Sequence, residues 1–115
     1  MRIALVSTCA LTTPPRAYGG TELVVANLAD ALTTLGHDVT VFATGDSSPA
    51  GRLRHHFQTP VWPPNDVAEL RHATAAWREI AKGGFDVVHV NHAMALPFTH
   101  FCRVPAVLTL HHERV

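Results

Sequence analysis

The chain has 115 residues, of which 47% are hydrophobic and 16% are charged. This size and composition predict one globular domain and exclude a disordered chain. Nine basic and nine acidic residues cancel, so no net charge favours nucleic acid or an anionic membrane surface. The apolar run at residues 3–7 is too short for a signal-peptide core or a membrane span. Cys9 and Cys102 do not form a disulfide framework, and we expect both to be free thiols in a reducing cytoplasm.

The first half of the chain begins with a strand, a long loop and a helix. Residues 3–7 are continuously apolar, which predicts a strand buried on both faces, and a loop with prolines and glycines follows. A helix is expected over 20–35, then a buried strand over 38–43 and a short strand near 53–57. The apolar stripe predicted for this helix consists of Val24, Val25, Leu28, Ala31, Leu32 and Leu35.

The second half repeats the alternation. A helix opens near Asp66, with Asp66 and Glu69 spaced as a capping box, and closes at the glycine pair 83–84. A buried strand over 85–90, a short helix over 94–101 and a last strand over 106–110 complete the pattern. The stripe expected on the second helix consists of Val67, Leu70, Ala73, Trp77 and Ile80.

This order of elements predicts an α/β fold in one domain spanning residues 1–115. We expect a Rossmann-like parallel sheet of about five strands with three flanking helices. Such sheets bind ligands at the carboxyl ends of their strands. The loop with the sequence PPRAYGG, residues 14–20, follows the first strand and therefore lies at that edge.

The glycine pair in this loop is the first candidate site. Gly19 and Gly20 can adopt backbone angles closed to other residues and let a ligand approach the main chain. The helix that starts there offers unpaired N–H groups to an anion, and Thr21 adds a hydroxyl that can cap the helix or bind phosphate. The dinucleotide pattern GxGxxG and the P-loop pattern GxxxxGK[ST] are both absent.

The run PPRAYGGTELVVANLADALTTLGHDVTVFATGDS resembles the amino-terminal domain of family 4 glycosyltransferases with the GT-B fold, and so do FDVVHVNHAMALPF and VPAVLTLHHERV. The resemblance implies an enzyme that transfers a sugar from a nucleotide-sugar donor with retention of configuration. It implies two domains facing across a cleft, with the acceptor held by the amino-terminal one, and no required metal or other cofactor.

The resemblance also implies roles for individual residues. Gly19, Gly20 and Thr21 would meet the donor diphosphate, and His111, in the pattern T-x-H, would help to hold the donor sugar. His112 leaves the choice between the two neighbouring histidines open. Asn91 and His92, which follow a strand on the same edge, would face the acceptor.

Other expectations concern the whole protein. We expect this chain to be an incomplete amino-terminal domain without the nucleotide-binding carboxyl-terminal domain, and to be inactive alone. The expected partners are a nucleotide sugar and a small-molecule, glycan or lipid acceptor, with no nucleic acid, in the cytoplasm or at the membrane face. The exposed sheet edge could also hold the missing domain or a second copy.

Two alternatives from other classes stay open. One is a stand-alone binding or regulatory remnant that uses the bare sheet edge. The other is a zinc module built from His55, His56, His89, His92 and the histidines at 111–112, although adjacent strand residues point to opposite faces and seldom share an ion. His89, inside a strand, is expected to be a hydrogen-bonded core residue.

Overall fold

The computed structural model describes residues 1–111, and in this part of the chain five parallel strands form one sheet. The strand order is β3-β2-β1-β4-β5, so that β1 lies in the centre between β2 and β4. Leu5 of β1, for example, pairs with Val41 on one side and with His89 on the other. The strands are β1 (Arg2–Val6), β2 (Asp38–Phe42), β3 (Arg52–Arg54), β4 (Val87–Val90) and β5 (Ala106–Leu108).

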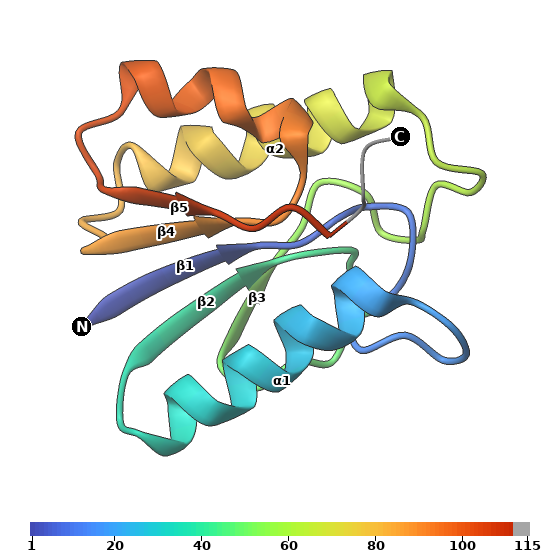
Figure 1. Ribbon diagram of the computed structural model, residues 1–115, viewed down its shortest axis with the longest axis horizontal. Helices are drawn as coiled ribbons and strands as arrows, with labels where there is room; N and C mark the ends of the chain where they lie inside the picture. The colour runs from blue at the N-terminus through green and yellow to red at the C-terminus, as the bar shows by residue number, and fades with distance from the viewer. Residues whose placement is uncertain (112–115) are drawn as a thin grey trace.

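Helices cover both faces of the sheet, which explains why its central strands are continuously apolar (Figure 1). Helix α1 (Gly20–Thr34) lies on one face, where Val25 and Ala29 pack against Ile3 and Leu5 of β1. Helix α2 (Asp66–Ile80) and the 3₁₀ helix η1 (Ala93–Phe101) lie on the other face. There a second core cluster contains Ala4, Val6, Phe42, Ala73, Ala76, Trp77, Ile80, Val88, Val90 and Ala95.

The predicted stripe of α1 is wrong in part. Val25 is fully buried, and Leu28 and Leu32 pack at the margin of the core, but Val24 is 44% exposed and Leu35 is 73% exposed. Besides Val25, the buried residues of this helix are the small Ala26 and Ala29 and the polar Thr21 and Glu22. Small side chains let the helix lie close to the sheet, so the larger aliphatic residues lie at the sides of the contact.

Helix α2 differs from its prediction in the same way. Val67 is 69% exposed and Leu70 is 40% exposed, whereas Ala73, Trp77 and Ile80 are buried as expected. The N-cap is Asn65, whose side chain accepts a hydrogen bond from the Ala68 amide, 2.7 Å away. The capping box predicted from Asp66 and Glu69 therefore does not form, since the cap lies one residue earlier.

The element ends also shift. The short strand predicted near 53–57 is observed as β3 over Arg52–Arg54, and the last strand ends at Leu108 rather than 110. The third helix is 3₁₀ and contains Pro97, which has no N–H to donate to a helical hydrogen bond. None of the helices in residues 1–111 is both long and apolar enough to cross a membrane.

Candidate functional site at the carboxyl edge of the sheet

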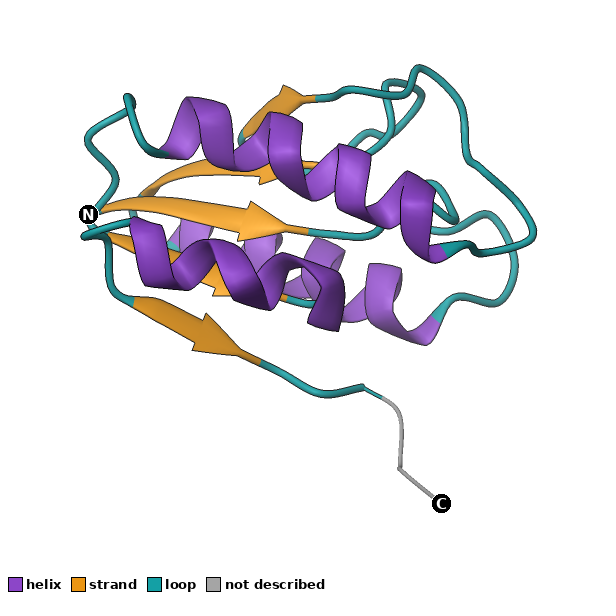
Figure 2. Cartoon of the chain, turned by 90° about the horizontal axis from the view of Figure 1, so that it is seen from above, coloured by secondary structure: helices purple, strands orange, loops and turns teal. Residues whose placement is uncertain are grey.

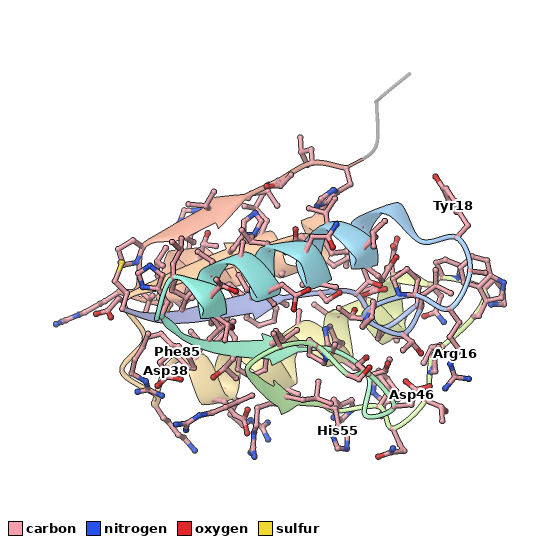
Figure 3. All side chains as sticks on the ribbon, turned by 90° about the horizontal axis from the view of Figure 1, so that it is seen from below. Arg16, Tyr18, Asp38, Asp46, His55 and Phe85 are labelled. Carbon is pink, nitrogen blue, oxygen red and sulfur yellow. The ribbon has the colours of Figure 1, made fainter. Side chains whose placement is uncertain are left out.

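The candidate site lies where the strands end and the loop of residues 7–19 begins (Figure 2). Because all strands are parallel, the segments that follow β1, β2, β4 and β5 emerge at this edge together with the start of α1. At the tip of the loop Tyr18 is 90% exposed and points away from the body of the molecule (Figure 3). The tip of the loop is therefore exposed to solvent and is not part of the core.

The base of this loop is anchored by the segment TGDS, residues 44–47, which follows β2. The Thr12 and Thr44 hydroxyls both donate to Asp46 Oδ1, at 3.1 and 2.7 Å. The Thr13 amide donates to Ser47 Oγ at 2.9 Å, and the Thr44 and Ser47 hydroxyls are 2.9 Å apart. The role of TGDS in this chain is thus to fix the loop that carries the glycine pair.

The two glycines of the pair have different roles. Gly19 is buried and has φ −178°, and neither Gly19 nor Gly20 has a positive φ. The freedom of glycine to adopt a positive φ is therefore not used at either position. A Cβ on Gly19 would lie 2.9 Å from Glu22 Oε1, 2.9 Å from Pro15 Cβ and 3.0 Å from Leu11 Cδ1, whereas a Cβ on Gly20 would meet only the Tyr18 hydroxyl, at 3.9 Å. Gly19 is needed for packing, and Gly20 leaves the outer surface open.

The start of α1 carries unused backbone donors. Its N-cap is Gly19, which has no side chain to cap the helix, and the first amide bonded within the helix is that of Leu23, 2.9 Å from the Gly19 carbonyl oxygen. Within residues 1–111 the amides of Gly20, Thr21 and Glu22 have no hydrogen-bond acceptor. Thr21 is buried in the first turn and is not the cap. Such amides, together with the helix dipole, form a site that favours an anion.

Two buried glutamates beside this loop were not predicted from the sequence. Glu22 of α1 is 5% exposed and accepts a hydrogen bond from the Thr8 hydroxyl. Glu69 of α2 is 3% exposed, and its Oε1 and Oε2 accept from the Cys9 amide at 3.1 and 3.3 Å. The two carboxylates thus hold the first residues of the loop from opposite faces of the sheet. The feature of the sequence that could have indicated them is an acidic residue in the first turn of each helix, on the face that packs against the sheet.

Burial perturbs several titrating groups near the end of β1. Desolvation raises the pKa of Glu69, and it raises the pKa of the Cys9 thiol to about 12, with the Glu69 charge adding to the effect. His72 is 3% exposed, and desolvation lowers its pKa to about 4, although its Nε2–H donates to the Ser7 carbonyl oxygen at 2.9 Å. At neutral pH this histidine is therefore an uncharged structural group.

The predicted residues of β4 and β5 come together at the same edge. Asn91 is 4% exposed, and its Oδ1 lies 2.8 Å from His111 Nε2. His92 is half-buried and accepts a hydrogen bond from the Met94 amide at 3.1 Å, so that it caps η1. The structure thus joins Asn91 to His111, whereas its described contacts place His92 in a capping role. His112, the alternative to His111, lies outside the described residues.

The remaining histidines do not form a metal centre within residues 1–111, where no three His, Cys, Asp or Glu side chains are placed to share an ion. His89 Nε2 is 2.6 Å from the Thr109 hydroxyl, but its buried Nδ1 has no hydrogen-bond partner among residues 1–111. His89 was predicted to be a hydrogen-bonded core residue, and this is confirmed for Nε2 but not for Nδ1. Two surface hollows beside α2 are lined by His56 together with Arg54 or Arg71, and they include none of the residues predicted to bind the donor or the acceptor.

Comparison with known proteins decides the family. The model of Glycosyltransferase Family 4 matches residues 18–114. The chain belongs to this family. As a family 4 chain it is a glycosyltransferase amino-terminal domain, as its sequence motifs predict.

Structural and curated comparisons add the following. The family 4 chain is similar in fold to the C-terminal domain, residues 78–226, of a hydrogenase from Pyrococcus furiosus, with 16% sequence identity and a TM-score of 0.60. The alignment covers 95% of this chain and 89% of that one, and at this identity it supports the α/β Rossmann-like fold alone. A search of curated proteins found no match.

Proposed function

We propose that this family 4 domain forms the acceptor-side half of a retaining glycosyltransferase, which transfers a hexosyl group from a nucleotide-sugar donor to an acceptor. The observation that carries the proposal is the start of α1, whose amides have no acceptor within residues 1–111 and which lies at the edge that presents His111. The family match supports a glycosyltransferase, and the geometry supports the position of the anion site.

The chemistry of the transfer explains why such donors are useful. When the bond between the sugar and the nucleotide diphosphate breaks, negative charge builds on the leaving phosphate oxygen. Fixed N–H groups of Gly20, Thr21 and Glu22 stabilise that charge, and removing one such donor typically costs about 10²–10³-fold in turnover. The proposal requires no metal or organic cofactor. The Glu22 carboxylate bonds to Thr8 and lies beside Gly19 with Pro15 and Leu11, on the inner side of the loop.

His111 is the proposed contact to the donor sugar, where it acts as a positioning group rather than as a nucleophile. His92, at the start of η1, faces the proposed acceptor, which is a small molecule, a glycan or a lipid. In this proposal a second domain presents the nucleotide, so the 115-residue chain has no transferase activity alone. Both cysteines are free, which fits a cytoplasmic location.

The anion site can be tested by titrating the ¹⁵N-labelled chain with UDP-glucose, GDP-mannose and inorganic pyrophosphate. Concentrations up to about 10 mM detect binding as weak as about −3 kcal/mol. We expect saturable shifts of the Gly20, Thr21 and Glu22 amides. The first turn of α2 is an internal control, because Asn65 caps it and its Asp66 side chain repels anions. Equal shifts at both helix starts, or none at α1, would overturn the proposal.

A second candidate function rests on β5, which is an edge strand of the sheet. Val107 is 54% exposed, and Phe101, just before this strand, is 89% exposed. Such an edge can bind a further strand of a partner or of a second copy of the chain. We therefore propose self-association at β5 as the alternative, which sedimentation measurements test: a monomer at every concentration would exclude it.

A further inference from the structure

The side chain of Asn91 is placed between three strands of the sheet. It follows β4, it is 4% exposed, and its Nδ2 lies 3.0 Å from the Val6 carbonyl oxygen at the end of β1. Its Oδ1 lies 2.8 Å from His111 Nε2, which follows β5. The Asn91 amide group therefore has a bonded partner at each end.

The partners of Asn91 determine which way its amide points. The Val6 carbonyl oxygen, and the His89 carbonyl oxygen at 3.5 Å, can only accept hydrogen bonds. The Asn91 NH₂ group must therefore face them, because the opposite orientation would bring oxygen against oxygen. The Asn91 oxygen is then left facing His111 Nε2, and an amide oxygen can only accept. It follows that His111 Nε2 carries a proton and donates it to Asn91.

We propose that Asn91 is a positioning residue that fixes the ring orientation and the Nε2–H tautomer of His111, and that it does not bind the acceptor. This assignment replaces the acceptor contact expected from the sequence. The tautomer of His111 is a property of the folded chain and does not depend on the proposed function. Its role in sugar transfer does rest on the proposed function. The Nε2–H group of His111 donates its hydrogen bond to Asn91, so any contact of His111 with the donor sugar uses another part of the ring.

A neighbouring pair provides a matched control. His89 Nε2 and the Thr109 hydroxyl are 2.6 Å apart and join the same two chain segments over the same sequence separation, 20 residues. A Thr109→Val substitution removes this second bond between β4 and the segment after β5, but leaves the Asn91–His111 bond. If Asn91 acts specifically, this variant keeps the tautomer of His111.

The test is two-bond ¹⁵N–¹H correlation spectroscopy of the histidine rings near pH 8, where neutral imidazole predominates. In the unmodified chain we expect His111 to show the Nε2–H pattern alone, and a dominant Nδ1–H pattern would overturn the proposal without any variant. Asn91→Leu, which offers no acceptor to the Nε2–H group, should lose the single pattern. Loss of the pattern in Thr109→Val as well, or its persistence in Asn91→Leu, would also overturn the proposal.

Titration with UDP-glucose separates this inference from the proposed function. If both are correct, His111 and the amides at the start of α1 shift in the unmodified chain, and Asn91→Leu loses the His111 shift but keeps the amide shifts. If the proposed function is wrong, the ligand causes no shift, while the Nε2–H pattern and its dependence on Asn91 are still observed.

Discussion

Alanine substitutions at the two adjacent glycines of the loop should have opposite effects on stability. In Gly19→Ala the new Cβ would meet Glu22 Oε1 and Pro15 Cβ at 2.9 Å, closer than normal packing allows. Neither neighbour moves easily, because the Glu22 carboxylate is bonded to Thr8 and Pro15 is a rigid ring. The backbone itself is permissive, since φ at Gly19 is −178°.

The size of the effect follows from these contacts. Overpacking a close contact costs about 1–3 kcal/mol, and the loss of glycine freedom in the unfolded chain offsets about 0.4–1 kcal/mol of this. The net destabilisation of Gly19→Ala is therefore about 1–2 kcal/mol, which lowers Tm by roughly 4–8 °C for a domain of this size. Gly20→Ala adds a Cβ with no contact closer than 3.9 Å, so its stability should stay equal or rise by up to about 1 kcal/mol.

Urea unfolding followed by circular dichroism measures both variants against the unmodified chain. The reasoning fails if Gly19→Ala is as stable as Gly20→Ala, because the inner packing of Gly19 would then impose no constraint. In the proposed function the ligand approaches the outer surface at Gly20, so Gly20→Ala should weaken the amide shifts caused by UDP-glucose although the fold is intact. Unchanged shifts would mean that the ligand does not approach this α-carbon.

Three further predictions concern groups near the loop. Because the folded pKa of His72 is lowered from 6.5 to about 4, its contribution to stability is complete above pH 6.5 and is lost as the pH falls towards 4. Between about pH 8 and about pH 4.5 the unmodified chain should lose about 2–3 kcal/mol more than His72→Gln in urea unfolding, and parallel pH profiles would refute this. The Cys9 thiol, with its pKa raised to about 12 by burial, should resist iodoacetamide in the folded chain, whereas the half-buried Cys102 reacts; mass spectrometry showing equal labelling would contradict this. Asp46→Ala should release the loop and speed tryptic cleavage after the exposed Arg16 by about 5–30-fold, since two hydrogen bonds worth about 1–2 kcal/mol are lost, and an unchanged rate would show that the loop does not depend on them.

The strands could be predicted because both faces of the sheet are covered. Residues such as Leu5 and Val6, which point to opposite faces, are both buried, and this gives the continuous apolar runs that the sequence displays. The face that each helix turns toward the sheet was less predictable. A stripe drawn through the largest aliphatic residues included Val24 and Val67, which are exposed, because close packing on a sheet favours alanine at the centre of the contact.

The location of the candidate residues at one edge of the sheet could be predicted from local sequence, but the contacts that support them could not. The glycine pair and His111 follow strands whose ends meet at one edge. Glu69, by contrast, bonds to the Cys9 amide 60 residues away, and this contact depends on how α2 lies across the sheet. Local spacing assigned the same glutamate to a capping box. The Asn91–His111 bond likewise needs the register of β4 against β5, which places the two segments side by side.

The two α-helices in residues 1–111 start at the same edge of the sheet, and their first turns differ. At α2 the Asn65 side chain accepts from the Ala68 amide, and Asp66 complements the positive end of the helix dipole. At α1 the N-cap is Gly19, and the acid of the first turn, Glu22, bonds to the Thr8 hydroxyl. Capping a helix with a side chain typically contributes about 1 kcal/mol, so its omission at α1 alone leaves donors for a ligand. This contrast within one molecule is the physical reason for proposing that the diphosphate binds at α1 rather than at α2.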